Sequence, residues 1–341
     1  MRGAFARKLA ELAEKDKRIC LLTGDLGFMA LEPFSDRHPD RFFNMGAAEQ
    51  NMVGVATGLA EAGFIPFVYS IVTFATLRPY EFIRNGAILN HLPIRVVGIG
   101  GGFEYGHNGA THYGLEDVGI MRVQPGMKVI APADSNQTET ILEKTWDMPG
   151  PIYYRLGKND KPIVPNLNGK YDFDKTELVK EGKDLLVVSM GAIAVEMAEA
   201  VATIDDGGIS CGHLVVSTLN PAPTEDLARV LKQYKTVITV EAHYVCGGLG
   251  SLICEVVAEN NLDTRVIRAA LKESPDGLTG SQHYLHDKYG ISSDRVITLA
   301  KEALSAPVDD DNDRNDSPAS LRHGAAKQSD NPRNLYCTAG T

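Results

Sequence analysis

The sequence predicts an α/β protein built from two consecutive, doubly wound domains with mostly parallel sheets. Short apolar runs rich in β-branched residues alternate with helical patterns along most of the chain, which is typical of repeated β–α–β units. One polar stretch interrupts this alternation, which then starts again. A chain of 341 residues with 43% hydrophobic residues is long enough to form more than one domain core.

The first domain is predicted over residues 1–156. It opens with a charged helical pattern, and two further helices are expected over 47–62 and 76–90. Four buried strands are expected around these helices, over 18–24, 64–70, 94–100 and 128–134.

The second domain is predicted over residues 184–305, after a polar linker over 157–183 that contains two prolines. Its strands are expected over 184–191, 213–219, 236–242 and 264–270, and its helices over 192–204, 224–234 and 249–259. Residues 306–341 are rich in Asp, Asn and Ser and have few large apolar residues. They are therefore expected to form a disordered tail, because they cannot bury enough apolar surface to offset the entropy of ordering.

The charge and the cysteines exclude several classes of function. The net charge of -10 argues against binding to nucleic acid or to an acidic membrane surface. No stretch is long and apolar enough to span a bilayer, and the first residues lack the apolar core of a signal peptide. The five cysteines have no metal-binding spacing, which favours reduced thiols and a cytoplasmic location.

An acid stands among small and apolar residues in the stretch NMGAAEQNMVG, residues 44–54. The helix dipole alone could explain Glu49 at the start of a helix. However, the later stretch GHNGATHYGLEDVGIMR, residues 106–122, places His107, Asn108 and His112 on a glycine-rich loop that follows a predicted strand. Polar groups on such a loop often line a functional site.

Together with APADSNQ, YYRLGK and VEAHYVCGGLGS, which follow in that order, these stretches resemble the C-terminal half of a transketolase. The resemblance extends over most of the chain before the predicted tail. It implies a thiamine-diphosphate pyrimidine-binding fold followed by a transketolase C-terminal fold. The implied activity is that of a transferase that moves a two-carbon ketol unit between sugars.

The resemblance also implies roles for individual residues. Glu49 shares a proton with the aminopyrimidine ring of thiamine diphosphate, and this relay prepares the cofactor carbon that attacks the substrate. His112 lies near the reacting carbon, which makes it the second catalytic candidate. Asp25 lies near the cofactor, and the apolar wall around the pyrimidine ring consists of Ile71, Phe74 and Leu77.

The positions implied to bind the substrate depart from the usual pattern of the family. Arg7 and Lys158 match positions that hold a sugar phosphate. His107 and Asn108 stand where common transketolases have Glu-Asp, so the acid that recognises a sugar hydroxyl is replaced by an amide. Replacements also occur near Gly100 and Met29, and we therefore expect a modified sugar or another anionic carbonyl substrate.

The GDG motif that binds diphosphate and a divalent ion in this superfamily is absent from the sequence. We therefore expect no metal ligands in this chain. A separate N-terminal subunit is expected to supply the diphosphate-binding domain and the ligands of Mg²⁺, in an α2β2 assembly. Three alternatives remain open: the β subunit of a 2-oxo-acid dehydrogenase decarboxylating component, an activity like that of deoxyxylulose-phosphate synthase, and a non-catalytic scaffold homologue.

Overall fold

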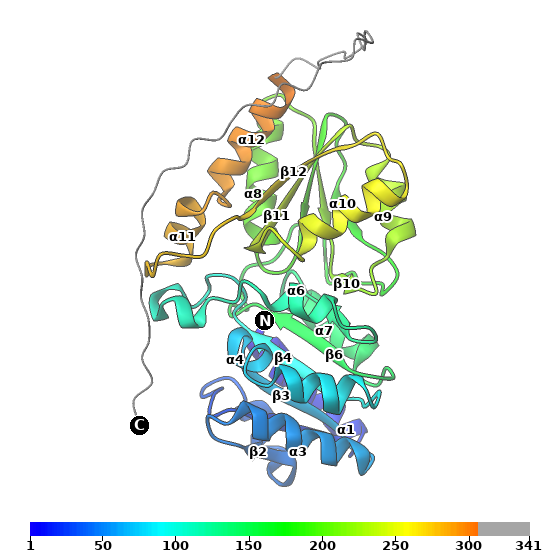
Figure 1. The fold of residues 1–341 in the computed structure, drawn as a ribbon, viewed down its shortest axis with the longest axis vertical. Coiled ribbons are helices and arrows are strands. Elements are labelled where there is room, and N and C mark those ends of the chain that lie inside the picture. The colour runs from blue at the N-terminus through cyan, green and yellow to red at the C-terminus, as the bar shows by residue number, and fades with distance from the viewer. Residues whose placement is uncertain (306–341) are drawn as a thin grey trace, which may run out of the picture. The chain divides into compact units, whose positions relative to one another are not determined.

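The computed structural model describes residues 1–305, which form two mostly parallel sheets covered by helices on both faces (Figure 1). The predicted α/β class with two doubly wound parts is confirmed. The tail predicted over 306–341 lies outside the described residues.

The first sheet has seven strands in the order β10-β5-β6-β4-β3-β1-β2. All neighbouring strands are parallel except β10, which runs antiparallel to β5. The strands are β1 (Ile19–Thr23), β2 (Phe42–Asn44), β3 (Ile65–Ile71), β4 (Arg95–Ile99), β5 (Lys128–Ile130), β6 (Ile152–Leu156) and β10 (Thr218–Asn220).

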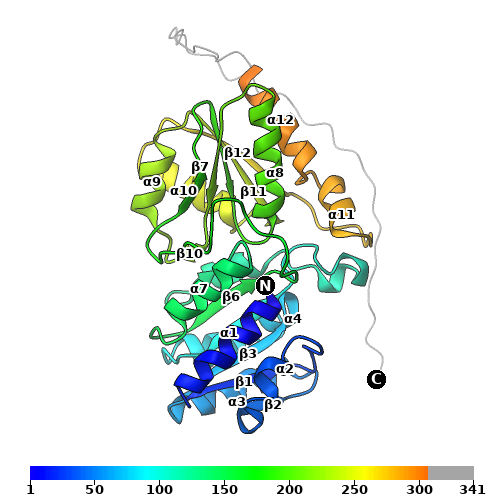
Figure 2. The ribbon, with the colours of Figure 1, turned by 180° about the vertical axis from the view of Figure 1, so that it is seen from behind.

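Helices α1 and α7 cover one face of this sheet, and α3, α4 and α6 lie on the other (Figures 1 and 2). The principal helices are α1 (Arg2–Lys15), α3 (Glu49–Glu61), α4 (Val72–Thr76), α6 (Asp117–Arg122) and α7 (Ser135–Thr145). The shorter helical segments are α2 (Glu32–Ser35), α5 (Tyr80–Phe82), the π-helix η2 (Ile83–Ile88) and the 3₁₀ turns η1 (Pro39–Arg41), η3 (Gly106–Asn108) and η4 (Ala110–His112).

The second sheet has five strands in the order β12-β11-β8-β9-β7, and only the edge strand β7 is antiparallel to its neighbour. Its strands are β7 (Glu177–Lys180), β8 (Leu185–Ser189), β9 (Cys211–Val215), β11 (Thr236–Tyr244) and β12 (Arg265–Leu271). The helices of this half are α8 (Ile193–Asp206), α9 (Thr224–Leu231), α10 (Leu249–Glu259), α11 (Gln282–Lys288) and α12 (Ser293–Ser305).

Several elements differ from the sequence-based expectations. The helix expected over 76–90 is divided into α4, α5 and η2, and Pro79, which cannot donate a backbone hydrogen bond, stands between α4 and α5. The strand expected over 213–219 is two strands, because β9 belongs to the second sheet while β10 crosses to the edge of the first. Part of the linker expected over 157–183 is the edge strand β7.

Strand β6 was not expected, although it lies between β4 and β5 in the first sheet. Its sequence contains a charged residue, Arg155, that is almost fully buried. The guanidinium donates hydrogen bonds to Asp117 Oδ2 at 2.8 Å and to the carbonyl oxygens of Gly114 and Ala242 at 2.9 Å each. Because Ala242 belongs to β11, this side chain connects the two sheets.

Within residues 1–305, no helix has the length and apolar character needed to cross a membrane. The four cysteines in this part of the chain are not in disulfides, and Cys337 lies outside it. No three His, Cys, Asp or Glu side chains of residues 1–305 lie close enough together to hold a metal ion.

A buried histidine makes the stability of the fold dependent on pH. His213 on β9 is 1% exposed, and its Nε2 lies 2.8 Å from Ser189 Oγ on β8. Burial lowers the pKa of His213 from 6.5 to about 4. The unfolded chain therefore binds a proton below about pH 6.5 that the folded chain does not take up until about pH 4, so stability falls as pH falls through this range.

We predict that His213→Leu reduces this acid sensitivity. Between about pH 7 and about pH 5, the wild-type protein should lose about 2 kcal/mol more free energy of unfolding than the variant. Urea denaturation at the two pH values measures the difference. His283→Leu is the control, because the side chain of His283 is 76% exposed and its removal leaves the buried contact between His213 and Ser189 in place. Equal pH dependence of the wild type and His213→Leu would contradict the prediction.

Candidate functional site

Glu49 is the first residue of α3, and it is only 2% exposed. Ser70 Oγ donates a hydrogen bond to Glu49 Oε1 at 3.0 Å, and a guanidinium nitrogen of Arg78 donates to Oε2 at 2.9 Å. A Cβ at Gly24 would lie 3.1 Å from Oε1, so the glycine leaves space for the carboxylate. The structure thus gives each carboxylate oxygen of this buried acid one hydrogen-bond partner.

An aromatic ring lies next to this carboxylate. Arg78 Cζ is 3.9 Å from the centroid of the Phe74 ring, which is within the range of a cation–π contact. Ile71 at the end of β3 is buried, whereas Leu77 at the end of α4 is exposed. Of the three residues predicted to surround the pyrimidine ring, Phe74 therefore has a contact that links it to Glu49.

His112 also contacts Phe74. The two ring centroids are 5.0 Å apart with an edge-to-face orientation, and His112 Nδ1 is 3.0 Å from Thr111 Oγ1. The loop that carries His112 is fixed at its end by Tyr113, whose hydroxyl donates to the Gly106 carbonyl oxygen at 3.1 Å. Both predicted catalytic residues, Glu49 and His112, thus lie within one series of side-chain contacts that passes through Arg78 and Phe74.

Tyr105 extends the series towards Lys158. Its ring centroid is 6.5 Å from that of His112, and Lys158 Nζ lies 4.7 Å from the Tyr105 centroid. A Cβ at Gly100 would be 2.2 Å from the Tyr105 ring, so this ring fills the space that a side chain at position 100 would need. Burial raises the pKa of Tyr105, and the positive charge of Arg2 opposes that shift.

Asp25 follows β1 and is exposed. Its backbone has φ of 58°, a conformation that non-glycine residues rarely adopt and that often marks a functional position. Asn44 Nδ2 donates to Asp25 Oδ1 at 3.0 Å, and both residues line a cavity of about 290 Å³.

Three predicted substrate-binding residues show no contact with this series. Arg7 on α1 forms an ion pair with Glu139 of α7 at 3.5 Å. His107 and Asn108 are exposed on η3, and no side-chain hydrogen bond is found for either one. The charge of Arg2, rather than that of Arg7, acts on Tyr105.

Sequence reasoning did not identify Ser70, Arg78, Tyr105 or Arg2. For Ser70 and Arg78 no signal was available, because both reach Glu49 from distant parts of the chain. Tyr105 could have been noticed, because it is a large residue just after the run Gly100–Gly102 and its ring lies against Gly100.

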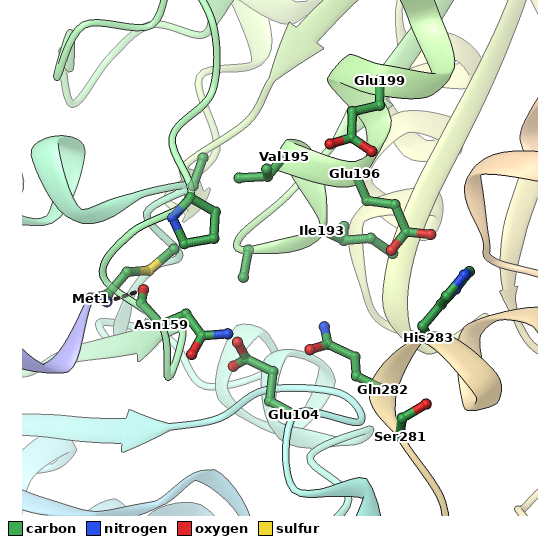
Figure 3. Close-up of a pocket in the computed structure, with 13 residues that line it drawn as sticks. Met1, Glu104, Asn159, Ile193, Val195, Glu196, Glu199, Ser281, Gln282 and His283 are labelled. Atoms are coloured by element: carbon green, nitrogen blue, oxygen red, sulfur yellow. Dashed lines mark hydrogen bonds between the residues drawn. The ribbon is translucent and has the colours of Figure 1, made fainter. Parts of the chain in front are cut away.

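A cavity beside the N-terminus does not include Glu49 in its lining. A cavity of about 390 Å³ is lined by Met1, Glu104, Glu196 and the 281–283 segment, among other residues (Figure 3). Glu196 is occupied by structural contacts, since it accepts hydrogen bonds from His286 Nδ1 at 2.7 Å and Ser293 N at 2.9 Å. Burial raises the pKa of Glu104, whose carboxylate accepts from the backbone N–H of Lys158.

The sequence matches two family models that together span most of residues 1–305. Residues 1–162 match the model of the transketolase pyrimidine-binding domain, and residues 174–296 match that of the transketolase C-terminal domain. The chain belongs to the transketolase family. Its two parts correspond to the family's pyrimidine-binding and C-terminal domains, as the resemblance of the sequence implied.

Three transketolase relatives are similar to this chain over nearly their whole length. It is 33% identical to a protein described as a transketolase C-terminal section from Methanocaldococcus jannaschii, covering 89% of this chain and 96% of that protein. It is 30% identical to one subunit of the apulose-4-phosphate transketolase of Phocaeicola vulgatus, covering 88% and 96%. It is 33% identical to a subunit of the 6-deoxy-6-sulfo-D-fructose transketolase of Clostridium sp. strain MSTE9, covering 89% and 94%.

A solved transketolase structure has the same fold. It is described as a split gene transketolase in an inactive beta4 tetramer, and the comparison gives a TM-score of 0.79 with 33% identity. The match covers 89% of this chain and 97% of that one. This transketolase-family chain is therefore similar to proteins that are themselves subunits of transketolases encoded in separate pieces.

Proposed function

We propose that this chain is the C-terminal subunit of a two-chain, thiamine-diphosphate-dependent transketolase. The observation that carries the proposal is the buried carboxylate of Glu49, which lies in one series of contacts with Phe74 and His112. The reaction would break a carbon–carbon bond of a ketose donor and form a new one to the aldehyde carbon of an acceptor. Thiamine diphosphate, when bound, supplies the carbon that carries the two-carbon unit.

The residues around Glu49 fit an aminopyrimidine ring. Such a ring is flat and carries nitrogen atoms that can exchange a proton with a carboxylate. Phe74 offers an aromatic face and Ile71 an apolar side. Glu49 Oε2 offers a hydrogen-bond acceptor, and Arg78 contacts both this oxygen and the Phe74 ring. Glu49 would hold and return the proton, and burial would keep water from competing for it.

On the substrate side, His112 would hydrogen-bond an oxygen of the reacting carbon. Lys158 contacts the Tyr105 ring and the charge of Arg2 acts on the same residue, so both would attract an anionic group of the substrate. Two relatives are named for ketoses that carry a phosphate or a sulfo group, apulose-4-phosphate and 6-deoxy-6-sulfo-D-fructose. Family membership alone therefore leaves the sugar open, and we propose a modified, anionic sugar as the substrate.

The site would be completed by a separate subunit that holds the diphosphate and Mg²⁺, in an α2β2 assembly. The outer face of α3 carries the exposed apolar side chain of Val55, and the neighbouring segment from α5 to the end of η2 carries those of Phe82 and Leu89. Exposed apolar surface of this kind is typical of an interface. A relative whose β chains form an inactive tetramer also supports the need for a second subunit. Scattered thiols outside disulfides are consistent with a reducing compartment such as the cytoplasm.

We predict that the isolated chain binds thiamine diphosphate weakly or not at all, because residues 1–305 hold no metal ligand cluster. Together with the N-terminal subunit, it should bind the cofactor tightly and only in the presence of Mg²⁺. Titration calorimetry measures both affinities. Val55→Asp on α3 should abolish assembly and cofactor binding, whereas Val123→Asp, at an exposed valine after α6, should not. Tight Mg²⁺-dependent binding by the isolated chain would refute the two-chain proposal.

We predict that Glu49→Gln lowers the turnover of the assembled enzyme by about 10²-fold or more, since an amide of the same shape cannot relay the proton. Assembly, measured by size-exclusion chromatography with light scattering, should be unchanged. Glu61→Gln is the matched control, because Glu61 is an exposed glutamate at the other end of α3. Turnover of Glu49→Gln within a few-fold of the wild type would be incompatible with the assigned role.

We predict that Tyr105 restricts which sugars the assembled enzyme accepts, because its ring occupies the space beside Gly100, between His112 and Lys158. The wild type should prefer apulose 4-phosphate or a sulfonated ketose over xylulose 5-phosphate, each tested with ribose 5-phosphate. Tyr105→Leu should reduce the preference by about tenfold, which corresponds to about 1.4 kcal/mol of discrimination. The measurement is kcat/KM for each donor. A wild type that favours xylulose 5-phosphate would contradict the substrate proposal.

A further inference from the structure

The contacts of Arg78 are those that the proposed function assigns to the cofactor ring. The guanidinium lies over the Phe74 ring, with Cζ 3.9 Å from the centroid, and it donates a hydrogen bond to Glu49 Oε2 at 2.9 Å. A guanidinium is planar and delocalised, stacks on aromatic faces, and presents N–H donors in its plane. An aminopyrimidine that stacked on Phe74 and bonded to Glu49 would use the same face and the same oxygen.

The hydrogen bond from Arg78 to Glu49 and a hydrogen bond from the cofactor ring to Glu49 would compete for the same position. Oε1 already accepts from Ser70 Oγ at 3.0 Å, and a Cβ at Gly24 would approach it to 3.1 Å, so this side of the carboxylate is crowded. Oε2 is the remaining oxygen, and Arg78 holds it. A carboxylate oxygen can accept a second hydrogen bond, so the exclusion is steric: the guanidinium contacts both Oε2 and the Phe74 ring, and a ring that used both would need the volume it fills.

The position of Arg78 in the chain makes this displacement inexpensive. Arg78 lies outside helix, between the end of α4 and Pro79, which precedes α5. Its side chain is 46% exposed although its partner is 2% exposed, so the guanidinium can move into solvent without unfolding an element. Glu49, by contrast, cannot leave its buried position at the start of α3.

From these contacts we infer that Arg78 is an internal substitute for the cofactor ring that must leave Glu49 and Phe74 before thiamine diphosphate binds. This inference rests on the proposed function. A buried carboxylate without a partner is costly, and Arg78 is the only Lys, Arg or His side chain that pairs with Glu49 within residues 1–305. Arg78 thereby stabilises the subunit before the cofactor arrives and weakens cofactor affinity in return. It acts as a positioning residue and determines affinity, and it takes no part in the chemical step.

The test compares Arg78→Met, Arg78→Lys and wild type, each assembled with the N-terminal subunit and titrated with thiamine diphosphate in Mg²⁺. Without the guanidinium, Glu49 lacks its cationic partner in the empty site. The free energy of cofactor binding then no longer includes the cost of breaking the contacts of Arg78. Arg78→Met should therefore lower Kd by about tenfold. Arg78→Lys keeps a charge that can pair with Glu49, so its Kd should stay near that of wild type.

Arg295→Met is the matched control. Arg295 on α12 is 43% exposed and pairs with Glu302 at 3.4 Å, and its loss should leave Kd unchanged. A Kd for Arg78→Met that is equal to or higher than that of the wild type, in a complex that still assembles, would overturn the inference. The absence of cofactor binding by the wild-type complex would instead overturn the proposed function, and this inference with it.

A second measurement applies if Arg78→Met disturbs assembly. In a crystal structure of the wild-type complex with thiamine diphosphate, the guanidinium of Arg78 should be beyond hydrogen-bond distance of Glu49, roughly 4 Å or more. An intact Arg78–Glu49 hydrogen bond alongside the bound ring would show that the two can coexist and would sink the inference.

Discussion

The buried pair of Arg155 and Asp117 fixes the segments on which the candidate site depends. Arg155 projects from β6 in the first sheet, pairs with Asp117 of α6 as its counter-ion, and donates to carbonyl oxygens of Gly114 and Ala242. Gly114 ends the loop that carries His112, and Ala242 belongs to the second sheet. One guanidinium thus holds a strand, a loop and the neighbouring sheet together. Because these groups are buried, loss of either charge would leave the other unpaired at a cost of about 3–5 kcal/mol.

The candidate site has an anionic end and a cationic end, with aromatic rings between them. Glu49 marks the first end, and Lys158 marks the second, where the charge of Arg2 also acts. Phe74, His112 and Tyr105 lie between these ends at centroid separations of 5.0 and 6.5 Å. Such an order is suited to a ring that exchanges a proton at one end and to an anionic substrate group at the other.

The residues around Glu49 also show how the proposed two-chain site could keep a buried carboxylate satisfied within one subunit. A carboxylate buried for proton transfer is unstable until its ligand is present, because burial removes the water that would solvate it. In this chain, Ser70 and Arg78 each donate a hydrogen bond to one carboxylate oxygen of Glu49. Ser70 is buried, whereas the side chain of Arg78 is 46% exposed, so only the second contact borders solvent.

The sequence by itself determined the α/β class, the restart of the alternation in the second half, and the transketolase family. These follow from features encoded within short stretches, namely apolar periodicity and ordered motifs such as the one around Glu49. Glu49, Phe74 and His112 were predicted as site residues from the resemblance to that family, and the structure brings them into one series of contacts. Element boundaries were less well determined where one segment serves two sheets, as for β9 and β10.

Only the tertiary structure decided the contacts between distant segments. It shows that Arg78 and Ser70 pair with Glu49, that Tyr105 takes the space beside Gly100, and that Arg7 pairs with Glu139 instead. It also shows that β6 is an inner strand despite its arginine. The physical reason is the same in each case. Periodicity records which face of an element is buried, but a buried charge or a missing side chain is explained only by the group that the fold brings against it from elsewhere in the chain.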